Sequence, residues 1–107
     1  MNKTPIHELT LTELKAGLEE GEFTATDVTA ALLDRIAEHD PLLNAMITVT
    51  GDAAMEAAGR ADERRAAGEA RPLEGLPIVH KDIFCTRDVK TSCGSRMLDN
   101  FVSPYDA

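Results

Sequence analysis

Apolar residues recur at helical spacing along most of the first seventy residues of this 107-residue chain. Thr10 and Glu13 have the spacing of a capping box, in which each side chain satisfies an unpaired N–H at the start of a helix. An apolar stripe at i, i+3 and i+7 follows, and Gly21 ends it. The stripe consists of Leu11, Leu14 and Leu18. The sequence therefore predicts a first amphipathic helix over these residues.

Two more helices are predicted further along. The second starts near Thr24, with Asp27 favourable beside the positive end of the helix dipole, and Pro41 is expected to forbid its continuation. The third is capped by Asp52 and runs to about Ala67, with Gly68 after it. We expect one face of the second helix to hold Val28, Ala31, Leu32 and Ile36, and the buried stripe of the third to hold Ala54, Ala57, Ala58 and Ala61.

Two short β-type segments separate these helices from the rest of the chain. Residues 44–49 are apolar and partly β-branched, and residues 76–80 follow a turn-rich connector, with Pro77 tolerable only near a strand's start. The order helix, helix, strand, helix, strand predicts an α/β fold with a right-handed parallel crossover. Because two parallel strands do not make a stable sheet, we expect the chain to be an amino-terminal piece of a longer protein.

The charge is unevenly distributed along the chain. The net charge of −8 lies entirely in residues 1–70, which carry 6 basic and 14 acidic side chains. Such an acidic stretch repels phosphate and disfavours a nucleic-acid surface. The longest uncharged stretch is far too short to cross a membrane, and the first residues lead into no apolar run, so we expect a cytoplasmic location and no membrane contact.

Lys81 is the strongest candidate for chemistry from the residues alone. Its ammonium follows directly on a predicted apolar strand, at the end where open α/β sheets usually place their clefts. Burial there would favour the neutral amine, a base that can activate a serine nucleophile. The alternative is an ordinary lysine paired with Asp82 at a strand end, and the spacing alone favours this alternative.

The segment Leu73-Glu74-Gly75-Leu76-Pro77-Ile78-Val79-His80-Lys81-Asp82 resembles the L-x-G-[IL]-P-[IV]-x-x-K-D motif of the amidase signature family. The stretches at residues 91–98 and 100–107 resemble one branch of it, the glutaminase subunits of the tRNA-dependent amidotransferases. The likeness covers nearly the whole chain and is weakest in the alanine-rich helix.

This resemblance implies a fold and a catalytic residue. It implies the amino-terminal part of the amidase signature fold, with helices packed on a mixed, largely parallel sheet, incomplete in this chain. Residues 1–107 would form part of a single domain, with a helical front half to residue 70 and the catalytic lysine in residues 71–107. The family's triad is Ser, a serine joined by a cis peptide bond, and Lys. The lysine corresponds to Lys81.

Neither catalytic serine has a counterpart here. Both belong to a glycine- and serine-rich segment of the family, and Ser92, Ser95 and Ser103 are not those serines. Ile83 also departs from the Lys-Asp-Asn of many members, which puts any role of an amide at that position in doubt. The family further suggests that some residues of the 91–95 stretch line the substrate pocket, although turn building explains them equally well. These residues are Thr91, Ser92, Gly94 and Ser95.

The implied function is release of ammonia from glutamine for amidation of Glu-tRNA(Gln), with Asp-tRNA(Asn) left open. Subunits B and C would be the partners, ATP and Mg²⁺ would act within one of these partners, and tRNA would be bound through the complex. This chain would bind no cofactor and would be inactive alone. The alternatives are another amide hydrolase of the same family and a non-catalytic interaction remnant.

A metal site is not expected. Cys85 and Cys93, with His80, lack zinc-site spacing and a fourth ligand. We expect the two cysteines to be reduced, buried small apolar residues.

Overall fold

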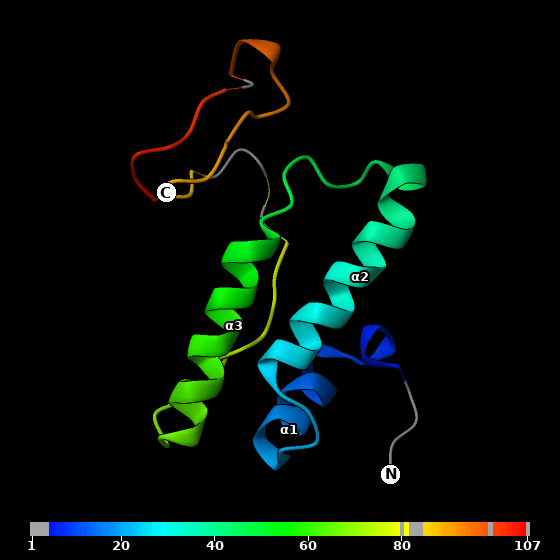
Figure 1. The fold of residues 1–107 in the computed structure, drawn as a ribbon, viewed down its shortest axis with the longest axis vertical. Coiled ribbons are helices and arrows are strands. Elements are labelled where there is room, and N and C mark those ends of the chain that lie inside the picture. Colours follow the sequence, from blue (N-terminus) through cyan, green and yellow to red (C-terminus); the bar gives the residue numbers. More distant parts are fainter. Residues whose placement is uncertain (1–4, 80, 82–84, 99, 107) are drawn as a thin grey trace. The chain divides into compact units, whose positions relative to one another are not determined.

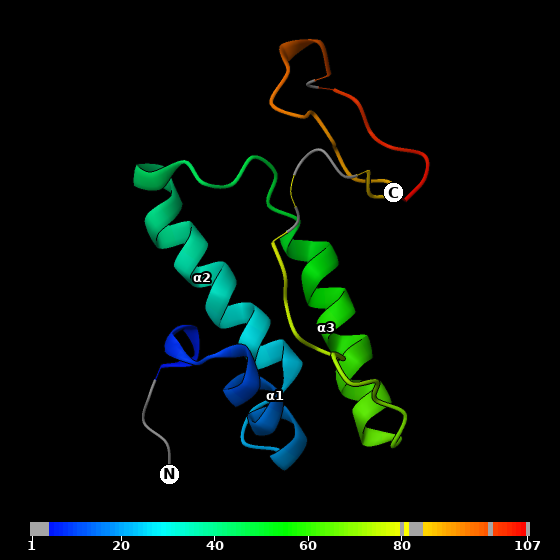
Figure 2. The same cartoon turned by 180° about the vertical axis from the view of Figure 1, so that it is seen from behind.

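The computed structural model describes residues 5–79, 81, 85–98 and 100–106 (Figures 1 and 2). The helices are α1 (Leu11–Glu20), α2 (Ala25–Leu43) and α3 (Gly51–Ala66), with two short 3₁₀ helices, η1 (Ile6–Glu8) and η2 (Arg96–Leu98). The chain divides into two compact units. Unit 1 contains Met1–Leu43 and Gly51–Pro77, and unit 2 contains Asn44–Thr50 and Ile78–Ala107.

The predicted first helix is confirmed, together with both of its ends. The Thr10 N–H donates to Glu13 Oε1 at 2.9 Å, and the Glu13 N–H donates to Thr10 Oγ1 at 3.2 Å. The backbone hydrogen bond from Thr10 holds the pKa of Glu13 below its ordinary value. Gly21 ends α1 in the left-handed conformation, at φ 76°, which a glycine adopts without steric cost.

Helix α2 has a similar reciprocal start but a different end from the one predicted. The Thr24 N–H donates to Asp27 Oδ2 and the Asp27 N–H to Thr24 Oγ1, both at 3.0 Å. The helix continues through Pro41 to Leu43, so the prediction that Pro41 forbids continuation was wrong. Proline's own φ is helical and its penalty falls on the preceding turn, which allows a short extension beyond it.

Helix α3 begins at Gly51 and ends at Ala66, one residue before the predicted end. Asp52 lies inside its first turn, so the prediction that Asp52 caps this helix was wrong. Gly68 follows it at φ 75°. Ala58 and Ala61 are buried and Ala54 is half-buried, whereas Ala57 is exposed, contrary to prediction. Ala57 precedes Ala58 by one residue and is therefore turned by about 100° around the helix axis, away from the neighbouring helices.

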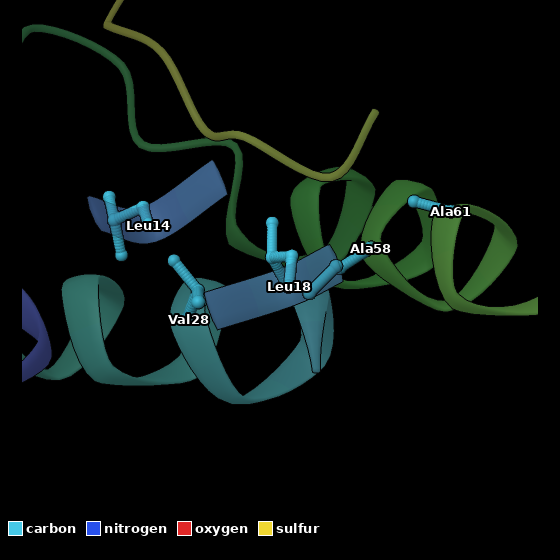
Figure 3. Close-up of a cluster of buried hydrophobic side chains, with 6 residues drawn as sticks. Leu14, Leu18, Val28, Ala58 and Ala61 are labelled. Carbon is cyan, nitrogen blue, oxygen red and sulfur yellow. The ribbon is translucent and has the colours of Figure 1, made fainter. Parts of the chain in front are cut away.

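The hydrophobic core lies in unit 1, between the three helices (Figure 3). Leu18 and Val28 are its largest fully buried apolar side chains. Leu11, predicted in the buried stripe, is instead 57% exposed, because its side chain stands at the first residue of α1, beyond the packed turns. The core consists of Leu14, Leu18, Ala25, Val28, Ala58 and Ala61, and Ile6, Leu9, Phe23, Leu32 and Leu76 pack against it.

Neither β-type segment forms a strand in the part of the chain that the structure describes. Residues 44–49 and 76–79 are irregular, and His80 lies outside the described residues. The one bridge between described residues is isolated and antiparallel, between Lys90 and Val102. A strand requires a series of backbone hydrogen bonds to a neighbouring strand, and the described residues of these two segments are not assigned to any such strand. The predicted sheet therefore stays a prediction.

Candidate functional site

A tight turn precedes Lys81 in the chain. The Glu74 N–H donates to the Arg71 carbonyl at 3.0 Å, and the Leu76 N–H donates to the Leu73 carbonyl at 3.2 Å. Leu76 then packs against the helical core. The first part of the amidase-like motif is thus held on unit 1.

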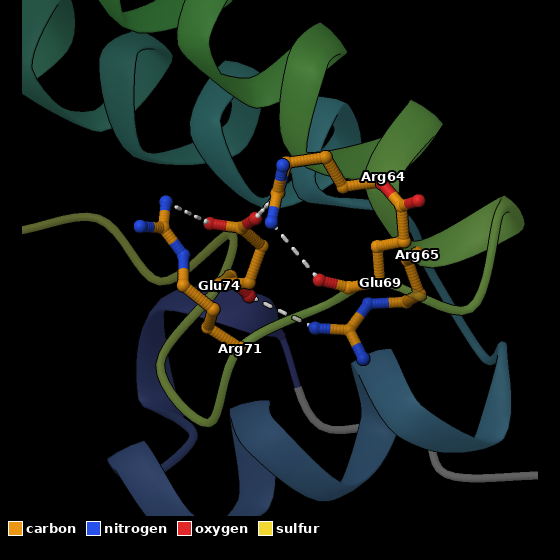
Figure 4. A network of polar contacts seen from close by, with 5 residues as sticks. All are labelled: Arg64, Arg65, Glu69, Arg71 and Glu74. Carbon is orange, nitrogen blue, oxygen red and sulfur yellow. Dashed lines mark hydrogen bonds and ion pairs between the residues drawn. The ribbon is translucent and has the colours of Figure 1, made fainter.

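Glu74 anchors this turn to the end of α3 (Figure 4). Its carboxylate, in a side chain only 11% exposed, accepts hydrogen bonds from Arg64 Nε and, at 3.3 Å, from Arg71 Nη2. Its backbone carbonyl accepts from Arg65 Nη2 at 2.9 Å. Arg64 also donates to the Glu69 carbonyl at 3.1 Å. Three guanidinium groups therefore fix one glutamate at both its side chain and its backbone.

The electrostatics of this cluster favour the ionised carboxylate. Burial raises the pKa of Glu74, but the hydrogen bonds and charges of Arg64 and Arg71 together outweigh it, so that the pKa is lowered. Glu74 therefore carries its charge throughout the neutral range. Its role here is to hold the turn, because its two oxygens are already engaged.

Gly75 is required at its position by both conformation and space. Its φ is 87°, and a Cβ placed on it would lie 2.9 Å from the Ala25 Cβ on α2. The same Cβ would lie 3.6 Å from Leu18 Cδ1 on α1 and 3.7 Å from the Ala61 Cβ on α3. The glycine of the motif is where the turn approaches all three helices.

Lys81 lies in unit 2 and is exposed. No hydrogen bond or ion pair joins it to another described residue. Burial, which would favour a neutral amine, is thus not seen in this structure. The predictions for Asp82 and Ile83, and the neighbouring His80, fall outside the described residues.

The four predicted pocket residues lie together in one turn of unit 2. The Ser95 N–H donates to the Ser92 carbonyl at 2.8 Å, and the Gly94 N–H donates to Ser92 Oγ at 3.4 Å. Cys93 and Gly94 both have positive φ, at 54° and 71°. Thr91 and Ser92 are each only 3% exposed. This geometry is that of a closed turn with its first two residues inside.

Local hydrogen bonds engage the hydroxyl groups of this turn. Thr91 Oγ1 donates to the Val89 carbonyl at 3.2 Å, and Ser95 Oγ accepts from the Met97 N–H at 3.2 Å at the start of η2. These bonds support the turn-building interpretation of Thr91, Ser92, Gly94 and Ser95. Their contact with a substrate stays a prediction.

A pair of extended segments frames the turn. The Asp88 N–H donates to the Ser103 carbonyl at 2.7 Å, and the Ser103 N–H donates to the Val89 carbonyl at 3.2 Å. The Thr91 N–H donates to the Phe101 carbonyl at 3.0 Å. Ser103 is fully buried, and its Oγ donates to the Tyr105 carbonyl at 2.6 Å. Ser103 therefore has a structural role.

The two cysteines differ in environment. Cys85 is half-buried and Cys93 is exposed, and both are free thiols. The prediction of burial is wrong for Cys93, which sits at the corner of the turn. Among the described residues, no group of three or more His, Cys, Asp or Glu side chains is arranged to hold a metal ion. None of their helices is long and apolar enough to cross a membrane.

Sequence reasoning missed the cluster around Glu74. The spacing of three residues between Arg71 and Glu74 inside a turn is a local sequence signal for their ion pair. The Arg64–Glu74 contact joins residues ten positions apart and depends on how the turn folds back on α3. That contact has no signature in the sequence.

Comparison with known proteins identifies the family. The Amidase family model matches residues 27–107, which include the whole of unit 2, the Glu74 cluster and Lys81. The chain belongs to the Amidase family. Its relationship to particular members is close.

Two curated relatives are each named as the A subunit of a glutamyl-tRNA(Gln) amidotransferase. The protein of Alkalilimnicola ehrlichii is 59% identical and that of Methylococcus capsulatus 60% identical, each over 102 residues and 95% of this chain. The chain spans 21% of the length of each. The Amidase match thus covers most of this chain, and the chain covers about a fifth of these relatives.

One solved structure superposes closely on this chain. It is described as "An unexpected vestigial protein complex reveals the evolutionary origins of an s-triazine catabolic enzyme". Its chain is 34% identical and superposes with a TM-score of 0.87. The superposition covers 92% of this chain and 22% of that one. An inhibitor-bound form of the same complex superposes with a TM-score of 0.86.

Proposed function

We propose that this chain is the amino-terminal part of the glutaminase subunit of a tRNA-dependent amidotransferase. The observation that carries the proposal is the identity of 59–60% to the two amidotransferase relatives over 95% of the chain. The Amidase family match to residues 27–107 supports amide chemistry.

The chemistry proposed for Lys81 is that of a general base. In its neutral form, the amine takes a proton, through a bridging serine, from the nucleophilic serine. That serine attacks the side-chain carbonyl of glutamine, and the C–N bond breaks with transfer of a proton to nitrogen. The products are an acyl-serine and ammonia, and water then releases glutamate. Both serines are supplied by polypeptide outside this sequence, so the chain by itself does not turn over glutamine.

In this proposal, the amidation of the acceptor tRNA takes place in the complex that this subunit forms with its partners. The partners are subunits B and C. The ammonia reacts with Glu-tRNA(Gln) in a partner subunit that uses ATP and Mg²⁺. The complex is cytoplasmic. Asp-tRNA(Asn) is a second acceptor to test in the same assay. The acidic residues 1–70 are consistent with tRNA binding elsewhere in the complex.

A second candidate is hydrolysis of another small amide. The 34% identity to a chain in a complex linked to the origins of an s-triazine catabolic enzyme favours testing it. The higher identity to the two amidotransferase relatives favours glutamine. The two candidates share the role of Lys81 and differ in the substrate and in the need for partner subunits.

The test is a chimera in which this chain replaces the matched fifth of the Methylococcus capsulatus relative, produced with that organism's partner subunits. We expect glutamine hydrolysis and amidation of Glu-tRNA(Gln). Lys81→Ala should lower glutamine hydrolysis at least about a hundredfold, because positioned general bases contribute that much or more. Lys15→Ala, which removes a half-buried lysine that pairs with Glu19 on α1, is the control and should keep activity.

Two results would contradict the proposal. One is a soluble, assembled chimera that hydrolyses a different amide and leaves glutamine intact. The other is a Lys81→Ala chimera that keeps more than a small fraction of the glutaminase activity.

A further inference from the structure

The turn that precedes Lys81 in the chain is held on unit 1 by a largely buried charge. The Glu74 side chain is only 11% exposed, and its carboxylate accepts hydrogen bonds from Arg64 and Arg71. Its backbone carbonyl accepts a further one from Arg65. Because a buried charge that loses its partners is costly, these contacts hold the turn strongly in place.

The segment between this turn and Lys81 has no comparable support among the described residues. Leu76 packs against the hydrophobic core. After it, no hydrogen bond joins Ile78 or Val79 to another described residue, and their side chains are 82% and 73% exposed. Lys81 is itself exposed and has no hydrogen bond to the described residues. Along the chain, the anchored turn is therefore the point of unit 1 nearest to the lysine that is firmly held.

Covalent geometry limits how far Lys81 can move from a fixed turn. Four residues separate Leu76 from Lys81, and five residue steps of extended chain span at most about 18 Å. A shift of the turn displaces the start of this short segment and with it the lysine. A misplacement of about 1 Å can slow a reaction about a hundredfold, because a base must lie within hydrogen-bond reach of the proton that it takes.

We propose that Glu74 is a positioning residue for Lys81: by its ion pair with Arg64 it holds the turn, and the turn keeps the lysine amine where it can accept its proton. The inference rests on the proposed role of Lys81 as a general base, which both candidate amide hydrolyses share. Glu74 itself takes no part in the reaction, because both of its carboxylate oxygens are engaged by arginines.

The experiment measures kcat and KM of the assembled chimera described above, on the amide that it hydrolyses and well below its unfolding temperature. Glu74→Gln should lower kcat about tenfold and leave KM unchanged, since it loosens the base without touching the substrate. Arg64→Gln removes the same ion pair from the other side and should have a similar effect. The double variant should lose little more than either single variant, because both substitutions act through one interaction.

The control is Thr10→Ala, which is also in unit 1 but far along the chain from the turn. It removes the capping box at the start of α1 and should therefore lower the midpoint of thermal unfolding. Its kcat should equal that of the unchanged chimera. If Glu74 had a structural role alone, Glu74→Gln would give the same pattern as Thr10→Ala, a lower midpoint with an unchanged kcat.

Four results would overturn the proposal while the unchanged chimera is active and needs Lys81. They are an unchanged kcat in Glu74→Gln, a raised KM with an unchanged kcat, an equal fall of kcat in Thr10→Ala, and additive losses in the double variant. The proposed function survives each of them. An assembled chimera that hydrolyses no amide, or one whose activity survives Lys81→Ala, contradicts the proposed function and this inference with it.

Discussion

The hydroxyl of Thr26, at the start of α2, donates a hydrogen bond at 2.7 Å to Asp62 Oδ2 on α3. The same carboxylate accepts the backbone N–H of Ala25 at 2.7 Å and that of Thr26 at 3.1 Å. Asp62 thus caps a helix to which it does not belong. It satisfies N–H groups that have no partner within α2, and it links α3 to α2.

Removal of this tertiary cap should destabilise unit 1. Asp62→Ala loses both acceptor oxygens, and we expect the free energy of unfolding to fall by about 1–2 kcal/mol, as for the loss of a helix cap. Urea unfolding followed by circular dichroism measures the change. Asp34→Ala, at an exposed position on α2, is the control and should lie within about 0.5 kcal/mol of the unchanged chain. Equal effects of the two substitutions would contradict the assigned role of Asp62.

Stability should also decrease in acid. Burial raises the pKa of Asp62, but the hydrogen bonds from Thr26 and Ala25, with the charge of Arg65, lower it overall from the ordinary 3.8. A carboxyl group whose pKa is depressed on folding contributes stability above its unfolded pKa. That contribution is lost as the pH falls through the lower, folded-state value.

We therefore expect the free energy of unfolding to fall as the pH drops below about 4. The pKa of Glu74 is also lowered, so it adds to the same dependence. Asp62→Asn cannot titrate and should show a shallower loss over this interval. Urea titrations at a series of pH values test this, and parallel profiles for the two proteins would exclude Asp62 as a source of the effect.

Gly75→Ala should be among the more damaging small substitutions in unit 1. The left-handed φ strains an alanine, and the added Cβ would lie 2.9 Å from that of Ala25. We expect a loss of about 2–4 kcal/mol, from backbone strain together with overpacking.

Gly68→Ala is the matched control for Gly75→Ala. Gly68 has a similar φ of 75° but no heavy atom within 4 Å of the added Cβ. Its loss should therefore be only the backbone strain of about 1 kcal/mol. Adding Ala25→Gly to Gly75→Ala should recover part of the difference. If the two glycine substitutions were equally costly, crowding at Gly75 would have no energetic effect.

Glu74→Gln should loosen the turn that precedes Lys81. The amide removes the charge that pairs with Arg64 and Arg71 and turns one of the two acceptor oxygens into a donor. We expect a lower midpoint of thermal unfolding. Glu69→Gln is the control, because Glu69 contributes its backbone carbonyl to Arg64 and that carbonyl is unchanged. A midpoint that is the same in both variants would show that the charged cluster does not stabilise the turn.

The two ends of α1 were the most predictable part of this protein. The capping pair of Thr10 and Glu13 lies three residues apart, and Gly21 supplies the left-handed end of α1. Such signals act through groups within one helical turn, so the sequence alone determines them. The continuation of α2 past Pro41 was missed because proline disfavours the turn before it rather than its own position.

Contacts between residues far apart in the sequence could not be predicted from the sequence and are shown only by the tertiary structure. Asp62 reaches Ala25 and Thr26 across more than thirty residues, and the exposure of Ala57 beside buried Ala58 depends on where the neighbouring helices lie. For the candidate site, the order of residue types along the chain was sufficient to predict the amidase-like motif and its lysine. The structural reason for Gly75, whose added Cβ would contact residues of all three helices, could not be predicted from the sequence.

The sequence by itself determined the three helices, both ends of α1, the start of α2, the position of Lys81 and the resemblance to amidases, because each depends on neighbouring residues or on residue order. Only the tertiary structure decided which faces are buried, how Glu74 holds its turn, and that the apolar residues of unit 2 are exposed. Those properties depend on what packs against each residue. The same reason explains the missing strands: residues 44–49 and 76–79 have strand-like composition, but a strand also requires a hydrogen-bonded neighbour.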